Sequence, residues 1–169
     1  VNTYFKLTAD IYLNDESEYS TWSSTSAPSN NANKWTPIGA ADATGDYGVA
    51  RHFGGVFDGD GYTIYGMYCS TEHTAGTGLF GSVRRGTIKN LTVENAYLTS
   101  TSTYIGGIVG FAFAPSVGIV IDNCGFNGNI ISSNGAARSG GILGCAQLFG
   151  GKLTVSNCWS KGTVQSGGA

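Results

Sequence analysis

Short apolar runs that begin and end with glycine recur along the second half of the chain. Each run is followed, after a variable segment, by a β-branched pair of residues and an asparagine. The first pattern occupies Gly78–Gly81, Gly107–Gly110 and Gly141–Gly144, and the second occupies Thr87–Val93, Val120–Phe126 and Thr154–Ser160. Successive copies lie between 29 and 34 residues apart. A period of about 20–50 residues is typical of a solenoid or a similar array.

Each repeat contains short runs of strand-forming residues separated by small polar residues. No run is long enough, or periodic enough at 3.6 residues, to predict a helix. One turn of such strands cannot bury its inward face alone, whereas stacked turns can. The pattern therefore predicts an all-β fold, a right-handed parallel β-helix (solenoid). The expected inward ladders are Leu91, Cys124 and Cys158 with Met67 as a further member, and Leu79, Ile108 and Ile142.

We expect a single β-helix domain over the whole chain of 169 residues. The repeats are expected over 57–169, after an irregular N-terminal region over 1–56. Within that region, Tyr4–Leu13 is rich in β-formers, which predicts one or two strands. The polar stretch 14–34 predicts a long surface loop.

The C-terminal residues repeat an earlier sequence. Ser166–Ala169 resemble Ser139–Ile142, where a copy of the first pattern opens. We therefore expect the chain to be a fragment of a longer repeat protein.

Asparagine marks the point in each repeat where a strand meets a corner, at Asn90, Asn123 and Asn157. Asparagine tolerates the left-handed backbone conformation, and stacked amides can hydrogen-bond from turn to turn. These residues are therefore expected to be structural. Asn90 also begins a glycosylation acceptor sequence that ends at Thr92, but its place in the repeat favours the corner role. The paired glycines are expected to adopt positive φ at sharp corners and to let turns approach closely.

Two cysteines occupy equivalent positions of successive repeats. Cys124 and Cys158 stand where Leu91 stands in the earlier copy. One interpretation is that both are small apolar residues of the stack, and the other is a disulfide between neighbouring turns. Cys69 and Cys145 have no partner at an equivalent position, and no C-x-x-C pair of a usual zinc site is present.

The repeats resemble a known family. The Gly-Leu/Ile-x-Gly and Ile/Val-x-Asn-Leu/Cys patterns, with Phe57–Ile64 before them, are similar to the GLUG-motif repeat proteins of bacteria. Tyr4–Ile11 and Trp35–Gly39 are similar to the segment that precedes such repeats, so the resemblance covers nearly the whole chain. It implies a secreted or wall-attached protein, either adhesin-like or the non-catalytic part of an IgA-peptidase-like protein, and it implies no catalytic residues. The chain departs from the family in the loop 14–34 and in its cysteines.

Composition and charge argue against several classes of partner. Hydrophobic residues make up 41% of the chain, charged residues make up 12%, and the formal net charge is −2. Nucleic acid is not an expected partner because no basic stripe is present. Membrane insertion is not expected because no apolar run of about 18 residues is present. No cofactor pattern is present, so no cofactor is expected.

Few residues are candidates for chemistry. Asp58 and Asp60 lie in an Asp-Gly-Asp-Gly sequence, which we interpret as a tight turn. The alternatives are weak calcium ligands or the acidic pair of a polysaccharide-active enzyme. His52 and His73 lie in loops rich in glycine and threonine, where a histidine is expected to be solvated or locally hydrogen-bonded.

Three aromatic residues stand in or beside the polar loop. Tyr19 and Trp22 lie within it, and Trp35 follows it. These side chains either pin the loop to the body or form a contact surface. If the chain binds a ligand, they are the candidate binding residues.

These observations predict a non-catalytic extracellular bacterial surface module, either an adhesin-like stalk or a binding surface for a host glycan or protein. No catalytic residue is assigned. One alternative is a carbohydrate-active β-helix enzyme that uses Asp58 or Asp60. The other is a subunit that self-associates through the solenoid ends, because an uncapped end exposes strand edges.

Overall fold

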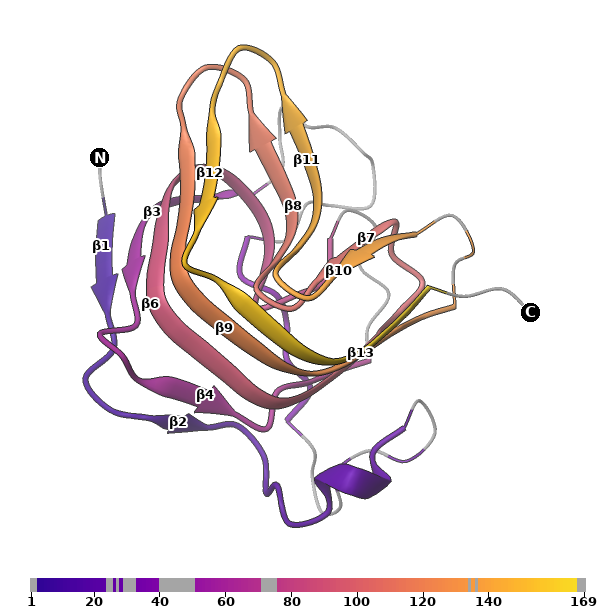
Figure 1. Ribbon diagram of the computed structural model, residues 1–169. Helices are drawn as coiled ribbons and strands as arrows, with labels where there is room; N and C mark the ends of the chain where they lie inside the picture. The colour runs from indigo at the N-terminus through magenta and orange to yellow at the C-terminus, as the bar shows by residue number, and fades with distance from the viewer. Residues whose placement is uncertain are drawn as a thin grey trace.

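Parallel strands stack into a right-handed β-solenoid of about three turns (Figure 1). The structure is a computed structural model that describes residues 3–23, 26, 28, 33–39, 51–70, 76–133, 135 and 137–166. All pairings between its named strands are parallel. The helical element of the described residues is the short 3₁₀ turn η1 (Tyr19–Thr21). The predicted parallel β-helix is therefore confirmed.

The first wall of the solenoid is five strands deep. Its strands are β1 (Thr3–Lys6), β3 (Phe53–Asp58), the middle of β6 (Phe80–Ser100), the start of β9 (Ile119–Ser132) and β12 (Leu153–Ser156). Equivalent residues stack in register. Val56, for example, pairs with Tyr4 on one side and with Thr87 on the other. The N-terminal segment thus supplies an outer strand of the solenoid.

Two further walls complete each turn. The second wall contains β2 (Ile11–Tyr12), β4 (Thr63–Tyr65), β5 (Tyr68–Cys69), the later parts of β6 and β9, and β13 (Trp159–Ser166). The third wall contains β8 (Val109–Ala114), β11 (Leu143–Leu148) and the start of β6. Before it, β7 (Tyr104–Gly106) and β10 (Arg138–Gly140) form a separate two-stranded parallel sheet. Strands β6 and β9 are long because each continues around a corner from one wall into the next.

Met67 is buried, but it is not a further member of the predicted Leu91 ladder, because Tyr68 pairs with Tyr97 and Met67 therefore stands level with Ala96. The other predicted members face inward: Leu91 and Cys124 are at most 1% exposed, and Leu79 and Ile108 are fully buried. Their equivalents in the last turn, Cys158 and Ile142, pack against the same core but are only partly buried. Large apolar side chains are exposed at both ends of the stack: Tyr4, Phe5 and Tyr12 on the first strands, and Leu148, Phe149, Val155, Trp159 and Val164 in the last turn.

No disulfide joins any of the four cysteines in this structure. Burial raises the pKa of the Cys124 thiol to about 12. Because the thiolate is the reactive form, we expect Cys124 to resist a maleimide in the folded protein, whereas the partly exposed Cys145 is labelled. Mass spectrometry of the labelled and digested protein measures both. A Cys124–Cys158 peptide pair that separates only after reduction would contradict this expectation and support the disulfide interpretation.

The three corner asparagines have left-handed backbones, with φ of 53° at Asn90, 50° at Asn123 and 53° at Asn157. The amide of Asn123 donates to Oδ1 of Asn90 at 3.0 Å. The amide of Asn157 donates instead to a carboxylate oxygen of Asp122 at 2.9 Å. The polar ladder along this edge therefore mixes amides and carboxylates. Nδ2 of Asn90, the atom that would carry a glycan, itself donates to Asp58, which supports the corner role.

The paired glycines of the repeated pattern were expected to adopt positive φ and to allow close approach of neighbouring turns. None of them has positive φ, so that part of the prediction is wrong. Close approach is the reason for glycine here. A Cβ added to Gly107 would lie 2.2 Å from the carbonyl oxygen of Gly141 and 2.3 Å from the ring of Phe126. These distances are too short for any real side chain, so neighbouring turns meet backbone to backbone.

Candidate functional site

Asp58, at the end of β3, carries a nearly buried carboxylate whose side chain is 8% exposed. Its Oδ1 accepts hydrogen bonds of 3.0 Å from Nδ2 of Asn90 and from the backbone N–H of Asp60. Its Oδ2 accepts a hydrogen bond of 2.9 Å from the Tyr4 hydroxyl and lies 3.0 Å from Nζ of Lys89. The donors come from β1, β6 and the turn after β3, so one carboxylate joins three successive strands of the first wall.

This setting suits a structural anion. Burial by itself would raise the pKa of Asp58, but the hydrogen bonds from Asn90, the Asp60 backbone, Lys89 and Tyr4 hold that pKa well below its ordinary value. A carboxylate stabilised in this way is a weak base.

The neighbouring carboxylate of Asp60 is paired as well, since it lies 2.9 Å from Nζ of Lys6. In the part of the chain that the structure describes, no group of three or more His, Cys, Asp or Glu could hold a metal ion. The geometry of Asp58 and Asp60 therefore supports the turn interpretation.

Two of the three candidate aromatic residues fix the N-terminal loop to the solenoid. Trp22 is 5% exposed, and its ring packs edge-on against Tyr19 and Tyr68 with centroid distances of 5.3 and 5.9 Å. The Tyr19 hydroxyl donates to the carbonyl oxygen of Ala96 at 3.2 Å. A ring with so little exposed area offers little surface to a ligand. The geometry therefore supports the pinning role of these side chains.

Trp35 has a separate structural setting. Its side chain packs, partly buried, against the main core, and its Nε1 donates to the carbonyl oxygen of Leu79 at 3.2 Å. Tyr19 and Trp22 belong instead to a smaller cluster with Tyr68. The structure thus does not bring the three aromatic residues to one surface.

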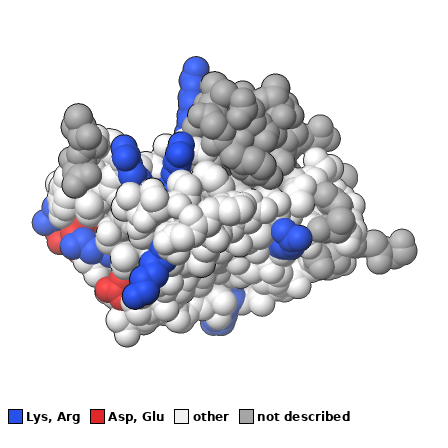
Figure 2. Space-filling view, turned by 90° about the horizontal axis from the view of Figure 1, so that it is seen from above, with Lys and Arg blue, Asp and Glu red and all other residues white. Residues whose placement is uncertain are grey.

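The corner between the third and first walls lengthens along the stack. Relative to β3, strand β6 has one additional residue at this corner, Arg84. In the following turn, residues 113–118 stand where β6 has only 84–85. The chain therefore projects outward between β8 and β9, and again between β11 and β12 (Figure 1). A long corner beside two short ones leaves a hollow on the outer surface. Lys and Arg side chains lie beside this hollow in Figure 2.

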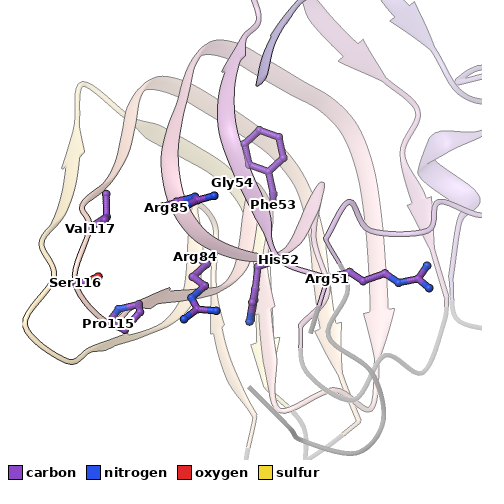
Figure 3. A pocket seen from close by; sticks show the side chains of 9 residues that line it. All are labelled: Arg51, His52, Phe53, Gly54, Arg84, Arg85, Pro115, Ser116 and Val117. Atoms are coloured by element: carbon purple, nitrogen blue, oxygen red, sulfur yellow. The ribbon is translucent and has the colours of Figure 1, made fainter. Parts of the chain in front are cut away.

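The hollow is a pocket of about 460 Å³ with three arginines in its lining. It is lined by Arg51, His52, Phe53, Gly54, Arg84, Arg85, Pro115, Ser116 and Val117 (Figure 3). None of these residues is acidic. Arg84 and His52 extend side by side next to Pro115, Arg85 lies along Gly54, and Arg51 extends the other way. The ion pairs between described residues involve Lys6 and Lys89, and none involves these arginines.

An aromatic platform holds two of the lining residues. The guanidinium of Arg84 lies 5.7 Å from the ring centroid of Phe113, and the His52 ring stacks on the same phenyl ring at 5.9 Å. Nδ1 of His52 also lies 2.6 Å from Oγ of Ser82. Phe149, which is 64% exposed, packs edge-on against Phe113 at 5.7 Å. Arg84, His52 and Phe149 therefore all contact one phenyl ring.

The sequence analysis does not single out this pocket. Its basic residues come from separate turns and form no charge run. The sequence signal that could have found it is the Arg84–Arg85 doublet at a corner that residues 113–118 of the next turn fill with small and apolar residues. His52 is locally hydrogen-bonded, as expected, and His73 lies outside the described residues.

Comparisons with models of protein families, with curated proteins and with solved structures find no match for the chain. No helix in the described ranges is long and apolar enough to cross a membrane. The fold defines the protein as a parallel β-solenoid, and its function is argued from the geometry of its own surface.

Proposed function

We propose that this chain is a non-catalytic module of an extracellular bacterial repeat protein of the GLUG-motif type, which presents a binding surface for a host glycan or protein. The observation that carries the proposal is the contrast between walls and corners. The walls keep their register through successive turns, whereas one corner lengthens from residues 84–85 in β6 to residues 113–118 in the next turn and contains the pocket. A rigid body with projecting loops is a suitable scaffold for presenting contacts.

The carbohydrate-active enzyme has less support as an alternative. A glycosidase uses two carboxyl groups about 5–10 Å apart on either side of the sugar, and the part of the pocket lining that the structure describes contains no carboxylate. Asp58 is engaged by four donors, and Asp60 is paired with Lys6. Self-association through the solenoid ends stays a prediction, with which the apolar side chains exposed at both ends are compatible.

An array of glycans and extracellular-matrix proteins, probed with the purified protein, tests the proposal. We expect a specific hit whose glycan keeps its length, as measured by mass spectrometry after prolonged incubation. A blank array would contradict the binding role. Shortened glycan would favour the enzyme, provided that the cleavage disappears when Asp58 and Asp60 are both changed to asparagine and the variant still unfolds cooperatively.

A further inference from the structure

Positive charge is concentrated at one pocket of a protein that is not basic. The chain has 9 Lys and Arg against 11 Asp and Glu, yet the described residues that line this pocket include three arginines and no acidic residue. A concave surface lined by charge of one sign raises the local concentration of ions of the opposite sign. The pocket therefore favours an anionic ligand.

Two of the arginines are held in place before any ligand binds. A Cβ on Gly54 would lie 3.2 Å from Cγ and Nε of Arg85, so the Arg85 side chain lies flat on β3 because position 54 has no side chain. Arg84 is stacked on Phe113. A guanidinium stacked by its face still presents its N–H edges, which match a carboxylate or a sulfate group in two-point hydrogen bonds.

The surroundings favour a sugar as the carrier of the anionic group. At about 460 Å³ the pocket lies within the usual range for small-molecule sites, which is about 300–1,000 Å³. Pro115 and Val117 are apolar members of the lining, and Val117 is 55% exposed, so the C–H face of a pyranose can pack against this part of the pocket. A free inorganic anion would make no use of that apolar surface.

We propose that this pocket binds an acidic sugar, with Arg84 and Arg85 contacting its carboxylate or sulfate group and Pro115 and Val117 packing against its ring. The proposal rests on the proposed function as a binding module and names the ligand class of that module. It assigns the site to the corner of the solenoid and not to the aromatic residues of the N-terminal loop.

Isothermal titration with two acidic probes tests the assignment: a heparin tetrasaccharide, which carries sulfate and carboxylate, and tetragalacturonate, which carries carboxylate alone. The test variant is the double change Arg84→Gln and Arg85→Gln. The control variant is Arg138→Gln with Lys161→Gln, which removes the same charge from exposed positions elsewhere. Arg138 is a close match, because its guanidinium lies over Tyr104 at 5.7 Å, the distance at which Arg84 lies over Phe113.

We expect the tighter of the two probes to bind at least about tenfold more weakly to the test variant and less than about threefold more weakly to the control variant, since charge-assisted two-point contacts are lost only in the first. Which probe binds more tightly distinguishes sulfate from carboxylate as the recognised group. Thermal unfolding of both variants shows that the fold is kept.

Other outcomes overturn the assignment. Equal weakening in the two variants would show a response to net charge alone. If maltotetraose bound as tightly as the acidic probes, the anionic group would not be what the pocket recognises. If tetraglutamate or a short DNA strand bound as tightly, the sugar would not be required. No binding of either acidic probe would also reject the site. In any of these cases, a specific hit on the array that is unaffected in the Arg84 and Arg85 variant would leave the proposed function standing.

Discussion

Replacing Asp58 with alanine is expected to lower the free energy of unfolding by about 3 kcal/mol, because a nearly buried carboxylate that joins three strands is lost. The Tyr4 hydroxyl, the Asn90 amide, the Asp60 backbone N–H and the Lys89 ammonium would each lose an acceptor. Lys89 and Tyr4 are exposed enough to turn to solvent, so most of the cost falls on the Asn90 amide and the Asp60 backbone N–H. Urea unfolding measures the effect, and we expect the slope of the unfolding free energy against urea concentration to stay the same.

The contribution of Asp58 also has a defined pH dependence. Because the folded state holds its pKa below the ordinary value, the stabilisation is fully present above the unfolded pKa of about 3.9 and is lost as the pH falls toward the folded pKa. The stability difference between the wild type and Asp58→Asn should therefore shrink below about pH 4.

Asp60→Asn is the matched control for this series. Its carboxylate is partly exposed and pairs with the exposed Lys6, and asparagine tolerates the φ of 52° at this position. We expect little change in stability at any pH. If Asp58→Asn were as stable as the wild type at neutral pH, the structural role of Asp58 would be wrong.

Replacing Gly86 with alanine is expected to cost about 3 kcal/mol or more, since backbone strain and overpacking act together. Gly86 has a φ of 110°, and a Cβ there would lie 1.9 Å from the carbonyl oxygen of Gly55 and 2.8 Å from its nitrogen. Both obstacles are backbone atoms of the adjacent strand, so relief requires the strands to separate. Chemical unfolding measures the loss, and failure to recover soluble protein would be its extreme form.

Substitutions at two other glycines separate the contribution of backbone strain from that of overpacking. Gly61 has a φ of 85° with nothing within 4 Å of an added Cβ, so Gly61→Ala should show backbone strain alone, about 1–2 kcal/mol. Gly118 has no positive φ, and its nearest contact would be the carbonyl oxygen of Lys152 at 3.5 Å, so Gly118→Ala should change little. Equal losses at Gly86 and Gly61 would show that close strand approach contributes nothing.

The repeated sequence predicts the solenoid because each repeat carries its own share of the core. Leu91 and Cys124, which occupy equivalent places in the repeat, pair directly in the structure. The first strand of the first wall was harder to place. Tyr4 pairs with Val56, 52 residues further on, and this interval is longer than the period of the repeats because the N-terminal loop interrupts it. Periodicity alone therefore does not reveal the pairing.

The candidate site was much less predictable. A pattern of repeats reports what successive turns share, whereas the pocket depends on a difference between them, namely residues 113–118 in place of 84–85. The role of Trp22 was also open, because a tryptophan in a polar loop can face solvent or the body. Its contact with Tyr68 decides the question, and that contact spans 46 residues of sequence.

The unequal corners also bear on how such a protein can diverge. Strands β8 and β9 keep their pairing with β6 although the connection between them is longer by four residues. Insertions and deletions at this one point are thus absorbed outside the hydrogen-bonded framework, where they cost little beyond the entropy of a longer loop. Evolution, or an engineer, can change what the surface recognises by altering the length of a single connection while every buried contact is inherited unchanged.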